Sequence, residues 1–189
     1  MKKFFSLNTK NATWGDYGNI LLIGILDSSN ENKIIMERSG PFIPEIYESF
    51  GTVIIKENIK KNIEIQFPDI EFVPVVKSKI VYLDWLNWNF ESDEPLMYPE
   101  SGEPEDYINS NEHDELVSQQ MGNIWAIKLP VWEGEAYPPR YYLSSDANDI
   151  PYNIFRSEKS LYPVISQNLK EWIENNCGEW VDFIELKIC

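Results

Sequence analysis

Few residues of this chain have the types and spacing that catalysis requires. The sequence contains one histidine, His113, in the run SNEHDEL, and two cysteines, Cys177 and Cys189. A hydrolase triad needs a base close to its nucleophile, so His113 would have to serve alone beside one of the two thiols. Glycosidase-type carboxylate pairs stay open, because the order of the acids does not give their separation in space. We therefore name no catalytic residue.

Phosphate-binding and metal-binding motifs do not occur at their usual spacings. Neither G-x-G-x-x-G nor G-x-x-x-x-G-K-[ST] is present, and WGDYGN, from Trp14 to Asn19, has two glycines three apart without a lysine, which is typical of a turn. C-x-x-C and H-E-x-x-H are also missing. An isolated histidine among acids is typical of a solvated side chain. We predict no metal site and no cofactor.

The stretch WNFESDEPLMYPESGEPEDY, Trp88–Tyr107, has the most unusual composition. It holds seven acids and four aromatic residues and has no Lys or Arg. A Ca²⁺ loop would need D-x-[DN]-x-[DN]-G, which is missing, and Pro95, Pro99 and Pro104 stiffen the segment. Aromatic side chains supply contact area, and carboxylates attract a basic partner. Two interpretations stay open: a recognition surface, or a solvated loop whose tryptophans belong to the core.

The first interpretation leads to a set of partner-binding residues, the acids of this stretch together with three of its aromatic residues. The predicted set is Trp88, Glu91, Asp93, Glu94, Tyr98, Glu100, Glu103, Glu105, Asp106 and Tyr107. The nearby Trp85 alternates with Val81 and Leu83, so we expect its side chain in the core.

The charge of the chain restricts its partners. Among 189 residues there are 16 Lys and Arg against 31 Asp and Glu, a formal net charge of -15. Such an excess disfavours binding to a phosphate backbone and favours solubility or a basic partner. The excess is concentrated, since eleven acids and no Lys or Arg lie between Ile80 and Ile127. We predict an acidic face, a basic protein partner and no nucleic acid.

The N-terminus and the cysteines predict a cytoplasmic protein. MKKFFSLNTKN begins like a secretory signal, but Asn8, Thr9 and Lys10 interrupt its apolar region after four residues, short of the usual length of about 7–15. The longest apolar run, ILLIGIL from Ile20 to Leu26, is too short to span a bilayer. Two cysteines without an export signal are typical of reduced thiols. We predict no membrane partner and leave the oligomeric state open.

Caps and hydrophobic spacing predict three helices, Lys56–Ile65, Ser110–Met121 and Ser166–Cys177. Runs of β-branched and aromatic residues bounded by Gly, Pro, Asn or Asp predict short strands. The predicted strands are Lys3–Leu7, Ile20–Leu26, Lys33–Met36, Thr52–Ile55, Ile70–Val76, Lys79–Trp85, Ile124–Leu129, Arg140–Leu143, Tyr152–Arg156 and Trp180–Ile188.

Two of the predicted helices lie in segments that resemble each other. A shift of 110 residues aligns VIIKENIKKNIE (Val53–Glu64) with PVISQNLKEWIE (Pro163–Glu174). One inserted residue later IEFVPV aligns with VDFIEL, which places Phe72 on Phe183. Two interpretations stay open, a duplicated strand-helix-strand unit or the chance likeness of two amphipathic helices. In both cases the acidic stretch lies between the two segments.

Together these elements predict an α+β fold, a mostly antiparallel sheet with two or three helices. The length and the 43% hydrophobic content fit a single domain over residues 1–189. If the duplication exists, the halves are 1–90 and 123–189, joined by an acidic connection at 91–122.

Four segments carry a resemblance to a known group of proteins: RSGPF (Arg38–Phe42), FVPVVKSKIVYLDW (Phe72–Trp85), YPESGEPEDYI (Tyr98–Ile108) and IFRSEKSLYPVISQNLKEWIE (Ile154–Glu174). In this order they resemble the immunity proteins of bacterial polymorphic toxin systems whose defining domain was first described in a myxobacterial protein. The resemblance implies a cytoplasmic protein that binds and neutralises a cognate toxin, and it brings no catalytic residue. The alternatives are a small enzyme with a pocket of carboxylates and histidine, and a structural or assembly module.

Overall fold

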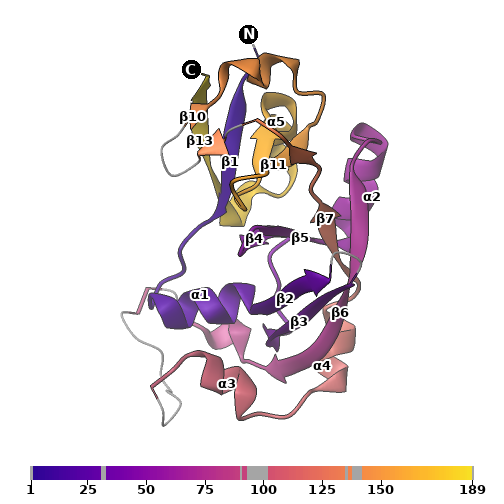
Figure 1. Cartoon of the computed structure of the whole chain (residues 1–189). Helices are drawn as coiled ribbons and strands as arrows, with labels where there is room; N and C mark the ends of the chain where they lie inside the picture. Colours follow the sequence, from indigo (N-terminus) through magenta and orange to yellow (C-terminus); the bar gives the residue numbers. More distant parts are fainter. Residues whose placement is uncertain are drawn as a thin grey trace.

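Two mixed sheets form the framework of the protein in a computed structural model (Figure 1). The structure describes residues 2–30, 33–89, 91–92, 102–134, 136–137 and 142–188. One sheet has seven strands in the order β8-β11-β12-β1-β13-β10-β9, and the other has six in the order β2-β3-β6-β7-β5-β4. The strands are β1 (Phe4–Thr9), β2 (Ile25–Asn30), β3 (Lys33–Gly40), β4 (Ile46–Ser49), β5 (Thr52–Lys56), β6 (Glu71–Tyr82), β7 (Ile124–Lys128), β8 (Val131–Trp132), β9 (Ala136–Tyr137), β10 (Tyr142–Leu143), β11 (Ile154–Ser157), β12 (Val164–Ser166) and β13 (Val181–Ile188).

The helices of the described residues are short. The α-helices are α1 (Asp16–Ile23), α2 (Glu57–Gln66), α3 (Glu105–Asn109), α4 (Glu115–Gln120) and α5 (Gln167–Asn176). Single turns of 3-10 helix are η1 (Trp85–Asn87), η3 (Ser145–Asp149) and η4 (Gly178–Trp180). No helix in the described part of the chain is both long and apolar enough to cross a membrane.

The α+β class and the predominance of antiparallel ladders are confirmed, but the described strands form two sheets rather than one, and the helices are more numerous than predicted. The sheets are mixed, because β3 pairs with β6, β8 with β11, and β10 with β13 in parallel, while the other ladders of the described strands are antiparallel. The described residues also form five α-helices rather than two or three. The two additional helices, α1 and α3, have no strong cap in the sequence, and neither has a cap hydrogen bond from the side chain before it.

The two sheets repeat one arrangement of strands. In the first, the order β2-β3-β6-β7-β5-β4 contains a parallel pair β3-β6 and an antiparallel hairpin β4-β5. In the second, β9-β10-β13-β1-β12-β11 contains the parallel pair β10-β13 and the hairpin β11-β12 at the same places. Helix α2 follows β5 as α5 follows β12. The unit from β2 to β6 therefore recurs from β9 to β13.

The registers of the ladders match residue by residue. Ile55 pairs with Trp125 as Ile165 pairs with Phe5, and Phe72 pairs with Ile127 as Phe183 pairs with Leu7. By these registers Phe72 and Phe183 are equivalent positions. The second unit therefore has one residue more between its two aligned strands, as the sequence alignment predicts. Of the two open interpretations, the registers therefore support a repeated strand-helix-strand unit. In each unit a further strand lies between the two strands of the motif.

That further strand comes from the opposite half of the chain. Strand β1 lies between β12 and β13 and is antiparallel to both, whereas β7 lies between β5 and β6 in the same way. In chain order, β1 precedes the first unit and β7 precedes the second. Each leading strand thus completes the sheet of the other unit, an exchange of equivalent strands within one chain.

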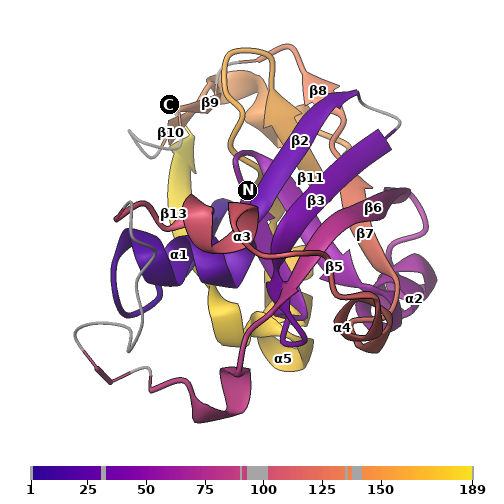
Figure 2. The same ribbon diagram turned by 90° about the horizontal axis from the view of Figure 1, so that it is seen from below.

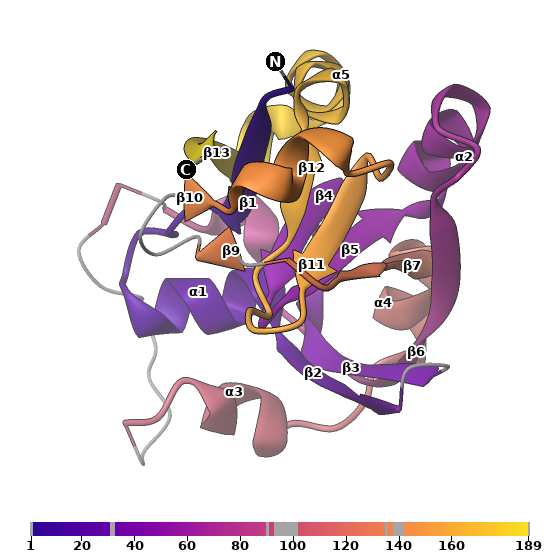
Figure 3. The same ribbon diagram turned by 45° about the horizontal axis from the view of Figure 1, so that its top comes forward.

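The hydrophobic residues form one shared core and two outer cores. Helices α2 and α5 lie on the same side of the molecule (Figure 3), and their buried residues meet in the shared core with Ile55 and Ile165. The preceding residues Ile54 and Val164 face the outer cores of the six-stranded and seven-stranded sheets. Because side chains alternate along a strand, each sheet is covered on both faces. The halves therefore form one folded body.

Lysines on the two helices show the same duplication. Lys60 Nζ lies 4.6 Å from the ring centroid of Trp125 and 5.3 Å from that of Phe72. The equivalent Lys170 Nζ lies 5.2 and 5.4 Å from the two corresponding rings, those of Phe5 and Phe183. Each lysine also forms an ion pair with the glutamate four residues later. The aligned lysines of the two helices therefore each place an ammonium group over two aromatic rings.

Most predicted elements are found, with shifted boundaries. Lys56–Ile65 and Ser166–Cys177 correspond to α2 and α5, whereas Ser110–Met121 is wrong in its first half, because α4 begins at Glu115 after the cap Asp114. The predicted strands Ile70–Val76 and Lys79–Trp85 form the single strand β6. Its pairing changes at Pro74, from β7 on one side to β3 on the other, and the sequence does not record this change.

The strand predicted at Ile20–Leu26 is wrong. Residues 16–23 form α1, and Gly24, at φ +75°, ends the helix before β2 begins. A Cβ atom at Gly24 would lie 2.4 Å from Cβ of Arg38, so the backbone approaches β3 closely there. Leu21 and Leu22 are buried against the sheet. An apolar run of this length does not distinguish a buried helix from a buried strand.

Candidate functional site

Residues 105–122, which we call the acidic segment, are attached along strand β6 by a series of hydrogen bonds. Tyr107 Oη donates to the carbonyl of Tyr82 at 3.0 Å. Lys79 Nζ donates at 2.8 Å to the carbonyl of Asn109, the last residue of α3. Lys77 Nζ donates to carbonyls at the end of α4, those of Ser118 and Gly122. Residues 105–122 are therefore held against the sheet, and α3 lies beside α1 at one end of it (Figure 2).

His113 belongs to this attachment. Its Nδ1 accepts a hydrogen bond from the backbone N–H of Ile80 at 3.0 Å, and its Nε2 lies 3.2 Å from Glu115 Oε2. The next residue, Asp114, donates its N–H to the carbonyl of Ile80 and accepts from Val117 N–H as the cap of α4. Both nitrogens of the imidazole thus have partners, and the ring links the acidic segment to β6.

An aromatic cluster joins four segments that are distant in sequence. Phe42 stacks on Trp85 at 4.3 Å between centroids, and Trp88 stacks on Trp14 at 4.4 Å. Trp85 and Trp88 meet edge to face at 4.1 Å, and Trp180 of η4 lies 5.7 Å from Phe42. Trp88 is 9% exposed and Trp85 is half-buried. This cluster fixes the start of the acidic connection against both halves of the chain.

The run RSGPF is a structural junction beside this cluster. The Arg38 side chain is fully buried and donates to the carbonyls of Ser39 and Phe42 and to Tyr47 Oη. Ser39 Oγ donates to the carbonyl of Leu21 in α1. A Cβ atom at Gly40 would lie 2.7 Å from the sulfur of Met121, so α4 packs closely here. These contacts give the motif a structural role in packing.

The predicted partner-binding residues lie at different depths. Glu91, Glu105 and Asp106 are exposed or half-exposed on the surface, Glu103 precedes α3, and Tyr107 is bound to β6. Trp88 lies inside the aromatic cluster, away from any surface a partner could cover broadly. Four residues of the set fall outside the described residues: Asp93, Glu94, Tyr98 and Glu100.

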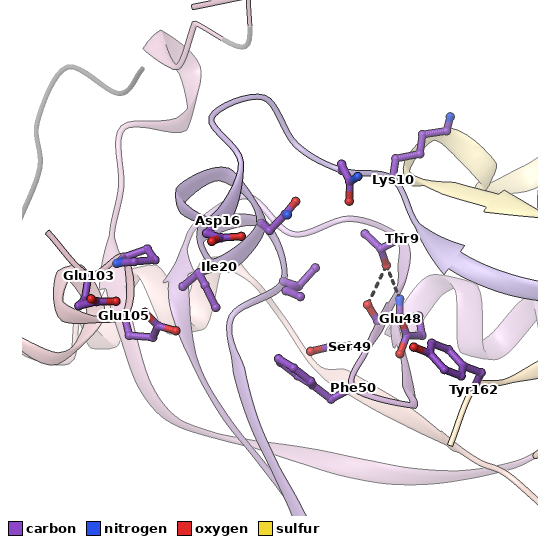
Figure 4. A pocket seen from close by; sticks show the side chains of 14 residues that line it. Thr9, Lys10, Asp16, Ile20, Glu48, Ser49, Phe50, Glu103, Glu105 and Tyr162 are labelled. Atoms are coloured by element: carbon purple, nitrogen blue, oxygen red, sulfur yellow. Dashed lines mark hydrogen bonds between the residues drawn. The ribbon is translucent and has the colours of Figure 1, made fainter. Parts of the chain in front are cut away.

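A pocket brings Glu103 and Glu105 together with residues from four other parts of the chain (Figure 4). Its volume is about 470 Å³. One wall consists of the start of α3 and the side of α1, and the opposite wall consists of the β4-β5 hairpin and Tyr162. We call it the acidic pocket, because four carboxylates and one lysine are among its lining residues: Asp16, Glu48, Glu103, Glu105 and Lys10.

Hydrogen bonds fix the hairpin side of the acidic pocket. Thr9 Oγ1 donates to the carbonyl of Glu48 and accepts from its N–H, both at 2.7 Å, which joins the end of β1 to β4. Glu48 Oε1 accepts from the N–H of Gly51, and burial raises the pKa of this carboxyl group. Lys10 Nζ donates to the carbonyl of Glu179 at 2.6 Å, so the ammonium is directed away from the carboxylates.

Ser49 is the unusual polar residue of this pocket. Its side chain is 1% exposed, and its Oγ has no hydrogen-bond partner among the described residues. It lines the acidic pocket, with the hydroxyl pointing from β4 toward the α1 wall (Figure 4). Buried hydroxyl groups are hydrogen-bonded in most proteins, so this one requires an explanation.

An exposed aromatic residue stands at the edge of the pocket. Phe50 and Gly51 form the two-residue turn of the β4-β5 hairpin at φ +49° and +84°, and Phe50 is 72% exposed. Leu161 and Tyr162, 67% and 44% exposed, come from the equivalent connection between β11 and β12. A Cβ atom at Gly51 would lie 2.6 Å from the carbonyl oxygen of Leu161, so the two connections touch. We call Phe50, Leu161 and Tyr162 the apolar rim.

Several lining residues have no signal in the sequence as site residues. Asp16 belongs to WGDYGN, which is typical of a turn, and Glu48 and Ser49 belong to β4, which the sequence does not predict as a strand. A signal exists for Phe50, because Phe-Gly occupies a two-residue hairpin turn where Asn-Gly is the usual choice. It becomes visible only once the flanking strands are known.

Metal-ligand groups and the described thiol, that of Cys177, bear on metal binding and catalysis. No group of three or more His, Cys, Asp or Glu within the described ranges could hold a metal ion. Burial raises the pKa of Cys177 to about 12, so its thiol is protonated at neutral pH and is a poor nucleophile. Cys189 lies outside the described residues. The acidic pocket and the apolar rim adjoin each other, because Phe50 and Tyr162 belong to both.

Comparison with known proteins adds no relative to this picture. No family model matches the chain, and no curated protein or solved structure was found to match it.

Proposed function

We propose that the chain is a cytoplasmic immunity protein, which binds and neutralises a cognate protein toxin through its acidic, aromatic-containing surface. The observation that carries the proposal is the acidic pocket beside the apolar rim. Protein interfaces combine exposed aromatic anchors with charges that select and orient the partner. The resemblance of four segments to immunity proteins agrees with this arrangement.

The basic nature of the toxin follows from the charge of the chain. The net charge is -15, and the four carboxylates of the pocket lie near one lysine whose ammonium is directed elsewhere. A positively charged partner is attracted to such a surface, and its association is accelerated at low salt. A toxin that acts on nucleic acid would have a basic surface of this kind, and the inhibitor would occupy it in place of phosphates.

The enzyme alternative is less well supported. It requires a pocket that joins His113 to carboxylates, yet His113 has hydrogen-bond partners at both ring nitrogens and does not line the acidic pocket. The Cys177 thiol is buried and protonated at neutral pH. Binding without chemistry is therefore the function that the described side chains support best.

Co-expression tests the proposal directly. The product of the gene immediately upstream is produced in a bacterial host with this chain or with an empty vector, and growth is measured. We expect growth arrest with the vector and recovery with the chain, together with a stoichiometric complex on gel filtration. Growth arrest that the chain does not relieve, or an upstream product without toxicity, contradicts the proposal.

A further inference from the structure

We infer that the acidic pocket receives an arginine side chain of the protein partner, and that the apolar rim packs against apolar side chains of that partner around it. The inference rests on the proposed function and specifies the place of contact and the chemistry of the inserted group. It assigns a role to Asp16, Glu48 and Ser49, which lie outside the acidic stretch.

The acceptors of the pocket match a guanidinium group. A guanidinium has five N–H donors in a planar fork and no acceptor, so it needs neighbours that accept. Asp16 of α1 and Glu105 of α3 supply carboxylates from one wall. On the other wall Glu48 Oε1 accepts from Gly51, and its Oε2 is a second acceptor. The volume of about 470 Å³ is within the range of roughly 300–1,000 Å³ for ligand sites.

Ser49 provides an independent indication of a ligand. The equivalent residue in the second unit is Ser157, because Ser49 follows Ile46 in β4 as Ser157 follows Ile154 in β11, and both strands pair in the same register. Ser157 is also buried, but its Oγ accepts from the N–H of Lys159 at 3.1 Å. Ser49 Oγ has no such partner among the described residues. An inserted N–H donor would satisfy it.

The apolar rim indicates that the cation is part of a protein. Phe50 lines the acidic pocket with an aromatic side chain that is 72% exposed, and Tyr162 also lines it. A small free cation would leave Phe50 and Leu161 in water. A protein surface that inserts an arginine and covers the rim would bury them, which is the arrangement found at the energetic centres of interfaces. Arginine is enriched at such centres.

The first experiment titrates the chain with capped arginine (N-acetyl-arginine amide) and follows backbone amide signals by NMR. We expect saturable shifts at Thr9, Glu48, Ser49 and Gly51, and none of these shifts with capped norleucine. The Asp16→Asn and Ser49→Ala variants should each weaken binding about tenfold. Shifts that are absent, or that are unchanged in both variants, overturn the inference.

The matched control is Ser157→Ala. This variant loses the hydrogen bond to Lys159 and should have a lower melting temperature with unchanged binding. Ser49→Ala removes an unsatisfied hydroxyl, so its melting temperature should equal or exceed that of the wild type while binding weakens. A lower melting temperature for Ser49→Ala with unchanged binding means that Ser49 is only structural, and overturns the inference.

The second experiment measures affinity for the toxin. Asp16→Asn and Ser49→Ala should each reduce the affinity about tenfold or more. Among arginine-to-alanine variants of the toxin, we expect one that reduces the affinity and for which Ser49→Ala causes no further reduction. If the wild-type chain neutralises the toxin and both pocket variants do so equally well, the inference fails and the proposed function stands. If capped arginine binds but neither change alters the affinity for the toxin, the pocket binds a free guanidinium compound. The inference that it receives an arginine of a protein partner is then overturned.

Discussion

Phe50 occupies a turn position at which its residue type is unfavourable for stability. Two-residue hairpin turns with positive φ at both positions favour Asn-Gly, because a bulky L-residue is strained in the left-handed region. Phe50 has φ +49° and is nevertheless 72% exposed, so its side chain gains little burial in return. Strained residues of this kind cluster at functional sites.

The Phe50→Asn change should therefore separate stability from binding. We expect the free energy of unfolding to rise by about 1 kcal/mol, because Asn tolerates the left-handed conformation. Affinity for the toxin should fall, since the rim loses its aromatic ring. Thermal denaturation and titration calorimetry measure the two effects, and Gly51→Ala is the control for the turn. That variant should be destabilised, because its Cβ would lie 2.6 Å from the carbonyl of Leu161 at φ +84°.

Glu48 should make stability depend on pH. Burial raises the pKa of its carboxyl group in the folded state, so folding favours the protonated form. The stabilising contribution is complete below the ordinary pKa of 4.5 and is lost as pH rises through the raised folded value. We expect Glu48→Gln to remove this loss and to be more stable than the wild type at pH 7. Urea denaturation between pH 4 and pH 8 tests this, and parallel curves for the two proteins would contradict it.

At the scale of elements, the sequence predicts those helices whose ends are fixed by local hydrogen bonds. Helix α5 begins after Ser166, whose hydroxyl accepts from Leu169 N–H, and this cap is readable in the sequence. The course of β6 is different, because it exchanges β7 for β3 as its partner at Pro74. The acidic pocket could not be predicted, since Asp16, Glu48 and Glu103 come from three segments that meet only after the sheets form.

The two equivalent helices allow a matched test of packing. Ile63 in α2 and Ile173 in α5 are 0% and 1% exposed and occupy corresponding positions in the shared core. Each change to Ala should cost about 2–4 kcal/mol in the free energy of unfolding. The double variant should deviate from additivity, because both belong to one cluster. Ile65→Ala, at a position in α2 that is 82% exposed, is the control and should change stability by less than about 0.5 kcal/mol.

The charges around α3 should control the rate of association. Changing Glu103, Glu105 and Asp106 together to Lys reverses the charge of this side of the acidic pocket. If the partner is the proposed toxin, we expect the association rate to fall about tenfold or more at low salt, with the melting temperature almost unchanged. Stopped-flow fluorescence at two salt concentrations measures this.

The control for charge is Asp69, Asp149 and Glu171 changed together to Lys. These exposed residues do not line the acidic pocket, and the change in net charge is the same. An equal loss of association rate in both triple variants would assign the effect to total charge. An unchanged rate in the first variant would exclude the acidic side of the pocket from recognition.

At the scale of the whole molecule, the exchange of β1 and β7 makes the halves depend on each other. Each sheet receives its inner strand from the other half, and both helices share one core. Matched helix positions in the sequence indicate a duplication without distinguishing it from a chance likeness of two amphipathic helices. The exchange has no signal in the sequence, since nothing in β1 identifies the sheet it joins. Long-range pairing of this kind depends on the complete fold.

The two fragments of a cleaved chain should therefore remain associated. A protease site inserted between Ser92 and Gly102 would separate β1–β6 from α3 and β7–β13. We expect the two fragments to co-migrate on gel filtration in native buffer after cleavage and to separate in urea. Each fragment produced alone should lack a cooperative thermal transition. Separation in native buffer, or independent folding of either fragment, would contradict the exchange of strands.

The exchange also determines when the protein can fold during synthesis. Strand β1 precedes the other described strands in the sequence, yet both of its neighbours, β12 and β13, lie much later, within Val164–Ile188. On the ribosome β1 therefore stays unpaired until β12 and β13 have emerged. A message that is broken, or translation that stops early, gives a product without either complete sheet. The cell would therefore obtain the folded protein only from chains that include β12 and β13, and shorter ones would remain substrates for proteases.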